Sequence, residues 1–163
     1  MDHQLRAATI LDLDAVLEWI GSAEGLRVWG GPALVHPPEA RAVWAAIQAE
    51  DRTTFVLVDR MGQVAGFGQI LPRAEATAHL ARIIVSPECR GLGLGRMLCR
   101  RLMAFAEKEF SSCTFTLKVY PGNAPAITLY RSLGFAACPS GNDEEVLLMK
   151  REMDGRPDPR PEA

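Results

Sequence analysis

Three glycines at alternate positions, Gly91, Gly93 and Gly95, separate an apolar run from an amphipathic stretch. The run at residues 83–85 is β-branched, which favours a buried strand, and apolar residues recur at helical spacing from 94 to 106. A strand, a glycine turn and a helix N-terminus together form an anion site, because free N–H groups of the first turn carry partial positive charge. We therefore expect this turn to bind a phosphate group.

Several arginines strengthen this expectation. Four of them cluster at the start of the expected helix: Arg90, Arg96, Arg100 and Arg101. Arg96 and Arg100 are four residues apart, so their charges repel by roughly a few tenths of a kcal/mol. Cations at this end also oppose the helix dipole unless an anion is bound. Pyrophosphate is the ligand that we expect.

Two other phosphate-binding loops do not fit this stretch. The dinucleotide fingerprint G-x-G-x-x-G would need glycine where Arg96 stands, and the nucleotide P-loop would need Gly-Lys-Ser/Thr. The segment Arg90-Gly91-Leu92-Gly93-Leu94-Gly95 instead matches R/Q-x-x-G-x-G/A. It resembles the acyl-CoA signature of the GNAT superfamily of N-acetyltransferases. The alternative is a glycine-rich corner that binds nothing.

A second segment, residues 123–135, resembles another block of that superfamily, N-x-x-A-x-x-L-Y-x-x-x-G-F. Every named position of the pattern is filled, from Asn123 through Tyr130 to Phe135. The resemblance implies that the cofactor, acetyl-CoA, is bound by the following residues: Ile83, Ile84, Val85, Arg90, Gly91, Leu92, Gly93, Leu94, Gly95, Arg96, Asn123 and Tyr130.

Acyl transfer from a thioester to an amine needs an acid for the leaving thiolate. Tyr130 is our candidate, because a phenol of pKa about 10 is protonated at neutral pH and can protonate a thiolate of pKa about 8.5. The superfamily also separates two strands near the thioester. The resemblance places that opening at residues 83–85, whose free backbone groups would pair with the pantetheine arm.

The base is less clearly marked. The ribosomal-protein alanine N-acetyltransferases, which this sequence resembles in both blocks, have glutamate five residues before the asparagine, where Lys118 stands here. His79 is the leading substitute, since an imidazole accepts a proton near physiological pH. Glu75 and Glu88 are weaker candidates, and a water chain without a dedicated base is an equal alternative.

The acceptor site is expected near Trp29-Gly30-Gly31-Pro32, in a loop between the first two helices. In the superfamily this region forms the acceptor side. Trp29 and Gly30 are therefore our candidates for substrate binding, although a tryptophan here could equally cover the core.

The composition is that of an ordinary globular domain: 163 residues, 48% hydrophobic, 23% charged, with a net charge of −2. This charge implies no nucleic-acid partner. The four cysteines form no C-x-x-C pair and the three histidines lie at no ligand spacing, so we expect no metal. No apolar run reaches the length of a membrane span, and free thiols fit a cytoplasmic protein.

The elements that must position these residues follow from periodicity and breakers. We expect strands at 4–10, 53–58, 63–71, 76–85, 114–120, from 135 and at 146–153, with Pro72 ending the third. Helices are expected from 12 or 14 to 20, at 38–50, at 94–110 and after Asn123, and residues 22–36 are expected to be an irregular loop. Residues 154–163, rich in proline and charge, are expected to be disordered.

This order predicts an α/β fold: a mixed sheet of six to seven strands with a splayed central pair and about four helices, in one domain at residues 1–153. The resemblance implies an N-acetyltransferase that moves acetyl from acetyl-CoA directly to a primary amine, either a small molecule or a peptide N-terminus. The first alternative is a non-catalytic acyl-CoA-binding module on the same fold, and the second is an anion-binding scaffold. A monomer or homodimer is expected.

Overall fold

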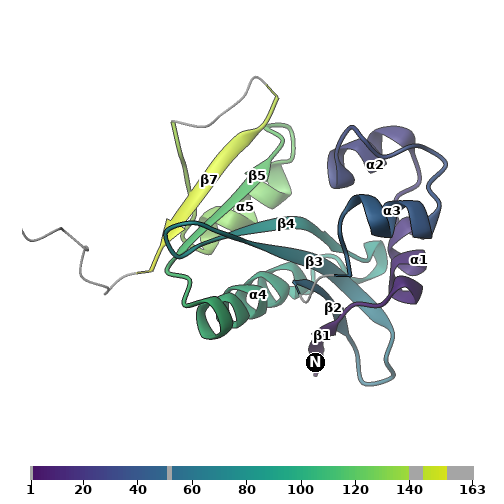
Figure 1. Ribbon diagram of the computed structural model, residues 1–163, viewed down its shortest axis with the longest axis horizontal. Coiled ribbons are helices and arrows are strands. Elements are labelled where there is room, and N and C mark those ends of the chain that lie inside the picture. The colour runs from purple at the N-terminus through teal and green to yellow at the C-terminus, as the bar shows by residue number, and fades with distance from the viewer. Residues whose placement is uncertain (1, 51–52, 140–144, 154–163) are drawn as a thin grey trace, which may run out of the picture.

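The computed structural model describes residues 2–50, 53–139 and 145–153, and the expected tail at 154–163 lies outside this part of the chain. One mixed sheet of seven strands in the order β1-β2-β3-β4-β5-β7-β6 runs through the molecule (Figure 1). The strands are β1 (Gln4–Ala7), β2 (Thr54–Val58), β3 (Val64–Arg73), β4 (Thr77–Val85), β5 (Thr114–Val119), β6 (Ala136–Ala137) and β7 (Leu147–Glu152). The predicted α/β sheet is confirmed.

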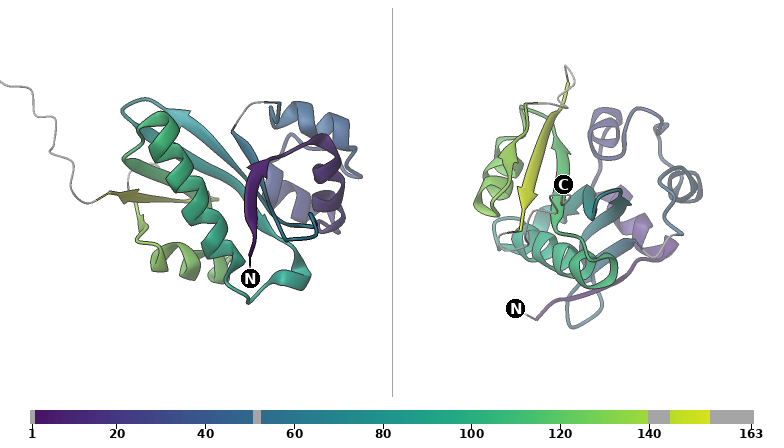
Figure 2. Two further views of the ribbon diagram at one scale, coloured as in Figure 1. Left: turned by 90° about the horizontal axis from the view of Figure 1, so that it is seen from below. Right: turned by 60° about the vertical axis from the view of Figure 1, so that its left-hand side comes forward.

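Helices cover both faces of this sheet (Figures 1 and 2). The α-helices are α1 (Ile10–Glu18), α2 (Ala23–Gly30), α3 (Ala40–Ala46), α4 (Leu94–Phe110) and α5 (Ala124–Ser132), and a short 3-10 helix, η1, spans Pro87–Cys89. The apolar stripe of α4 and the inner face of α5 pack on one side, around Leu98, Leu102 and Phe115. Helices α1 and α3 pack on the other side, around Leu13, Val43 and Phe67. In the described residues no helix is long and apolar enough to cross a bilayer.

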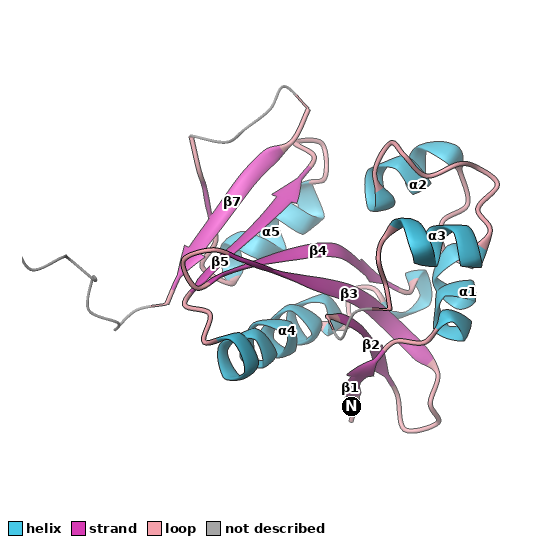
Figure 3. Ribbon diagram, viewed as in Figure 1, coloured by secondary structure: helices cyan, strands magenta, loops and turns pink. Residues whose placement is uncertain are grey.

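Helix α2 corrects the expected irregular loop at residues 22–36 (Figure 3). Its start is fixed by Ser22, whose side chain accepts a hydrogen bond from the Gly25 N–H at 3.0 Å. Leu26 is fully buried, so the helix contributes to the core that it shares with α1 and α3. This helix was not predicted because two of its eight residues are glycines, which have a low helix propensity.

Pro72 also differs from expectation, because β3 continues through it to Arg73. The N–H of Ile70 donates to Thr53 of the β2 side, so position 72, two residues on, points to the same side. Strand β2 begins only at Thr54, paired with Gln69, and therefore no ladder hydrogen bond is lost at the proline.

The central strands β4 and β5 pair in parallel over four residues only, from Thr77 opposite Thr114 to Leu80 opposite Leu117. Beyond that point the two strands part, while β4 stays paired with β3 as far as Val85. An irregularity opposite Gly68 accompanies the separation, and Arg82 there has a positive φ of 52°. This is a β-bulge, which bends the strand. The predicted splayed central pair is confirmed.

Candidate active site

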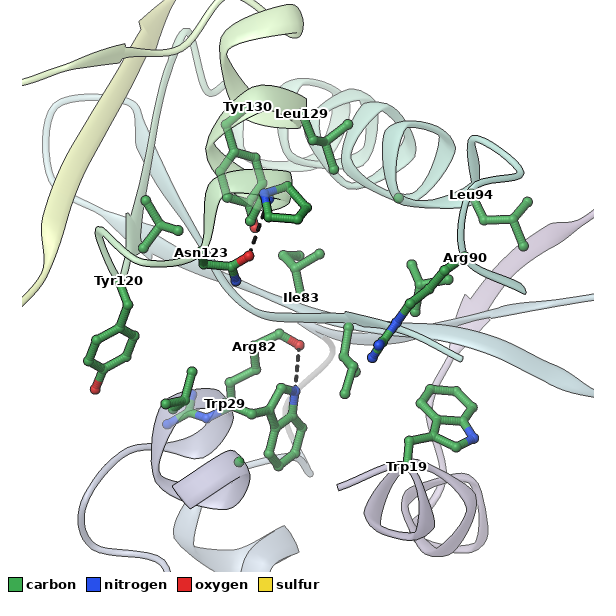
Figure 4. Close-up of a pocket in the computed structure, with 18 of the residues that line it drawn as sticks. Trp19, Trp29, Arg82, Ile83, Arg90, Leu94, Tyr120, Asn123, Leu129 and Tyr130 are labelled. Carbon is green, nitrogen blue, oxygen red and sulfur yellow. Dashed lines mark hydrogen bonds between the residues drawn. The ribbon is translucent and has the colours of Figure 1, made fainter. Parts of the chain in front are cut away.

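The separation of β4 from β5 opens a cleft of about 910 Å³. Its walls come from both strands, from α2, from the turn between η1 and α4, and from α5 (Figure 4). Every predicted cofactor residue except Leu92 lines it. The Leu92 side chain is exposed and faces a smaller surface hollow beside Met61.

One edge of β4 faces this cleft without a strand partner. The N–H of Ser86, the residue after the end of β4, donates to the Ala65 carbonyl of β3, so Ile84, two residues earlier, also directs its backbone groups toward β3. The backbone groups of Ile83 and Val85 therefore point the other way, toward the cleft. Of the three predicted residues, two offer free backbone groups, and Ile84 contributes only to the wall.

The glycine turn is shaped by two left-handed residues. Gly91 has φ +75° and Gly93 has φ +78°, and in both cases an added Cβ would meet no atom within 4 Å. These two glycines are required by backbone conformation. Gly95 differs, because its Cβ would lie 3.0 Å from Leu129 Cδ2. It permits the close packing of α4 against α5.

Helix α4 begins directly after this turn, at Leu94, with no acidic residue in its first turn. Its first N–H groups have no partner within the helix and lie where the cleft ends. A diphosphate fits this part of the cleft, because the backbone around Gly91 and Gly93 is open, the first helix N–H groups are free and two arginines lie beside the turn. An amide-rich arm fits the unpaired edge of β4. The residues present thus match the parts of coenzyme A.

The expectation that four arginines share one anion is wrong. Only Arg90 and Arg96 line the cleft, and Arg96 also donates to Ser132 Oγ at 2.8 Å. Arg101 instead donates to the backbone carbonyl of His3, on the far side of α4. Helical spacing explains the division, since residue 101 lies on another face of α4 than residue 96, whereas residue 100 shares the face of residue 96 but lies one turn farther from the glycine turn.

Tyr130 lies on α5 and reaches the cleft from within the core, with 7% of its surface exposed (Figure 4). Its ring contacts Phe135 edge-on at 6.1 Å. Burial raises the pKa of the phenol above its usual value, and the neighbouring Cys99 adds to the rise. Asn123 caps the same helix by accepting the Ala126 N–H at 3.3 Å. The arrangement keeps a protonated hydroxyl beside the opening.

His79 lies outside the cleft lining. Its Nδ1 is 2.9 Å from Thr116 Oγ1, across the part of β4 and β5 that remains paired. Burial lowers its pKa to about 4, with smaller contributions from the charges of Arg73, Lys118 and Arg82. At neutral pH the imidazole is therefore neutral, and it occupies a hydrogen bond between two strands.

The aromatic residues Trp19, Trp29 and Tyr120 also line the cleft, and in Figure 4 Trp29 lies between the other two, with Trp19 on the same side of the view as Arg90 and Tyr120 on the opposite side. Trp29 Nε1 donates to the Arg82 carbonyl at 3.0 Å, and the ring packs on Phe67 at 5.6 Å. Trp29 thus both covers the core and lines the cleft. Gly30 does not line the cleft; a Cβ there would lie 2.1 Å from Leu34 Cδ1, and its carbonyl accepts from Arg82.

Arg82 is a cleft residue that sequence reasoning missed. A charged residue inside the apolar run of β4 was the available signal. Its Nη1 donates to Gln69 Oε1 at 2.8 Å, while its Nε is buried with no hydrogen-bond partner. Burial lowers the pKa of the guanidinium.

The charge of the cleft lining is of one sign. The described residues that line the cleft include four basic side chains, those of Arg82, Arg90, Arg96 and Lys118. They include no aspartate, glutamate or histidine. The described residues also contain no group of three or more His, Cys, Asp or Glu placed to hold a metal ion.

Comparison with known proteins agrees with this architecture. The crystal structure of the ribosomal-protein-S18-alanine N-acetyltransferase from Escherichia coli superposes with a TM-score of 0.70 at 24% identity, covering 98% of this chain and 99% of that chain. In sequence, streptothricin acetyltransferase of Streptomyces lavendulae is 40% identical over 89 residues, 54% of this chain and 47% of the relative. The chain thus spans about half of that relative's length.

A further relative is the [ribosomal protein bS18]-alanine N-acetyltransferase of Escherichia coli K12, 37% identical over 98 residues, or 60% of this chain and 64% of the relative. The sequence model described as the acetyltransferase (GNAT) family matches residues 14–135, which include the glycine turn, both splayed strands and α5. The chain therefore belongs to the acetyltransferase (GNAT) family.

Proposed function

We propose that this protein is an N-acetyltransferase that moves an acetyl group from acetyl-CoA to a primary amine. One observation supports this most: a single cleft joins the free edge of β4, the glycine turn and the buried Tyr130 hydroxyl. An anion-binding corner alone would need only the turn. The curated relatives, named for acetylating streptothricin and a ribosomal protein alanine, support the same class of reaction.

Each part of the cleft has a separate task in this proposal. The N–H groups around Gly93 and the start of α4, with Arg90 and Arg96, bind the diphosphate. The backbone of Ile83 and Val85 aligns the pantetheine arm, and an N–H of this edge polarises the carbonyl. Acetyl-CoA supplies an activated thioester. The amine nitrogen bonds to its carbonyl carbon, the C–S bond breaks, and Tyr130 gives its proton to the sulfur.

The proton of the acceptor ammonium must also be removed. A role for His79 as base stays a prediction, and its low pKa and its place outside the cleft lining weigh against it. The positive lining offers another route. Cations such as Arg82 lower the pKa of an ammonium beside them, so that the proton can pass to water in the open cleft.

The proposal is tested with purified protein, acetyl-CoA and a panel of amines, by following thiol release and identifying the acetylated product. Calorimetry with CoA is the parallel measurement. Thiol release that depends on an amine supports the enzyme. CoA binding with no amine-dependent release would instead favour an acyl-CoA-binding module, which the lack of carboxylate and imidazole among the described lining residues makes the second candidate. Absence of CoA binding would overturn both.

A further inference from the structure

Arg82 is a cation in the acceptor half of the cleft, without an acidic partner. No carboxylate of the described residues lies within ion-pair distance of it. Its contacts are the Gln69 side-chain oxygen at 2.8 Å and the Gly30 carbonyl at 3.5 Å, both neutral, and its Nε has none. Neutral oxygens satisfy N–H groups but do not compensate the charge.

Holding this cation in place costs folding free energy. Removing a charge from water is unfavourable unless an opposite charge accompanies it. The side chain that binds Arg82 is nevertheless itself fixed in position. Gln69 is fully buried, and its Nε2 donates to Thr54 Oγ1 at 2.9 Å and to the Ile47 carbonyl at 3.1 Å. A guanidinium fixed this firmly in a cleft is typical of a site that recognises a planar anion.

The position of Arg82 indicates which bound molecule would carry the anion. Arg82 directly precedes Ile83, whose backbone faces the thioester side of the cleft, and its carbonyl holds Trp29 of the acceptor wall. A group bound there is close to the reacting amine rather than at the diphosphate end, where Arg90 and Arg96 lie. The anion and the amine therefore belong to the same small acceptor.

We propose that Arg82 binds a carboxylate of the acceptor, so that the substrate is a free amino acid or a similar amine carrying a carboxylate. This rests on the proposed N-acetyltransferase function. A polycationic amine is disfavoured, because it would meet only positive side chains among the described lining residues. Lys118, at the cleft end of β5, adds to the same field.

The test compares amino acids with their amides, which differ in the carboxylate alone, and uses phenylalanine and methionine as the two pairs. The wild-type protein should acetylate the acids with a kcat/KM about 10- to 100-fold above that of the amides, the range expected for a charge-assisted hydrogen bond. Arg82→Gln should remove this preference mainly through KM, and Arg82→Lys should keep part of it. Arg73→Gln is the control, because it removes an exposed arginine outside the cleft lining.

A second measurement does not depend on turnover. Calorimetry of N-acetylphenylalanine and its amide with CoA-loaded protein should give tighter binding of the acid, lost in Arg82→Gln, while CoA affinity stays unchanged. Equal binding of acid and amide by the wild-type protein would overturn the role of Arg82. No acetylation of any amine, with the acid still preferred in binding, would overturn the transferase and leave the anion site standing. The wild-type comparison holds even where Arg82→Gln fails to fold.

Discussion

The Tyr130 hydroxyl is held at the cleft by a side chain that is almost fully buried, and burial keeps it protonated. Tyr130→Phe removes this proton donor and little else, because the ring remains packed on Phe135. We expect kcat to fall about 100-fold, within the range for loss of a general acid, while the Kd for CoA changes less than about twofold. Steady-state kinetics and calorimetry measure the two quantities.

Tyr120→Phe is the matched control, since Tyr120 is the other tyrosine of the chain and lines the same cleft. The Arg27 guanidinium lies 5.5 Å from its ring centroid, a contact that phenylalanine preserves. Its effect on kcat should be much smaller than that of Tyr130→Phe. Equal effects of the two substitutions would mean that Tyr130 is not the specific acid.

His79 makes a prediction about stability and pH. Its pKa is 6.5 in the unfolded chain and about 4 in the fold, so the folded state favours the neutral imidazole. This contributes roughly 3 kcal/mol above pH 6.5, which is lost as the pH falls toward 4, with about 2 kcal/mol gone by pH 5. His79→Gln should lose less stability than wild type between pH 7 and pH 5 in urea unfolding.

The control is His36→Gln, at an exposed position, which should follow the wild-type curve. The same His79 variant also tests the base. Because His79 is outside the cleft lining, the acidic limb of its rate–pH profile should match that of wild type. A limb displaced or flattened in His79→Gln would restore the histidine as the base.

At this scale the sequence identifies residues that belong to a local pattern and misses those defined by long-range contacts. Tyr130 and the glycines were found because each block is continuous in the chain. Arg82 was missed because its meaning depends on Gln69 and Gly30, which are far from it in sequence. Arg100 and Arg101 were grouped with the cleft arginines because they are close in sequence, but Arg100 lies one helical turn beyond Arg96 and Arg101 donates to the His3 carbonyl on another face of α4.

At the scale of elements, one substitution in the glycine turn before α4 separates its effect on stability from its effect on CoA binding. Gly93→Ala places a Cβ on a residue with φ +78°, which costs about 1–2 kcal/mol of strain relative to glycine. The side chain itself meets open space, so the fold should survive. The turn must then shift to relieve the strain, and CoA affinity should fall at least about tenfold in calorimetry.

Gly62→Ala is the matched control for this change. Gly62 has φ +81°, an added Cβ there also meets nothing within 4 Å, and it lies in the turn between β2 and β3 outside the cleft lining. Its loss of stability should equal that of Gly93→Ala, with CoA affinity unchanged. A parallel loss of affinity in both variants would show that instability, not the turn, weakens binding.

Most elements could be predicted because local signals mark their ends. Helix α4 occupies the predicted 94–110, and the glycine turn and Asn123 begin the two helices as expected. The misses come from tertiary context. Ser22 supplies a cap that starts α2 in spite of its glycines, and Pro72 is tolerated because β2 does not extend alongside it.

At the scale of the whole molecule, the cleft walls come from both halves of the sheet, so a ligand there should stabilise the entire fold. At CoA concentrations near 100 times Kd, linkage adds about 2.7 kcal/mol, which raises Tm by roughly 5–10 °C in a chain of this size. Thermal unfolding with and without CoA measures the shift. Gly93→Ala should show a smaller shift at the same CoA concentration, and an unchanged Tm in the wild type would contradict a ligand site shared by both halves.

The opening itself could be predicted only through the family resemblance. The pattern of residues 76–85 indicates one continuous strand, and nothing local states that β5 leaves it after Leu117. That separation depends on where two distant strands stop pairing. The acceptor wall, including the contact between Trp29 and Arg82, depends on the same long-range geometry.

The bulge at Arg82 has a consequence for how this chain can vary in length. The one additional residue in β4 shifts the alternation of the strand, so that Ile83 and Val85 present their amides to the opening. Deleting Arg82 would remove the bulge but would leave Ile84 opposite Phe67, so that Ile83 and Val85 would still direct their amides toward the opening. The length of β4 can therefore change by one residue at this position without reversing those amides, because the bulge itself absorbs the change in alternation.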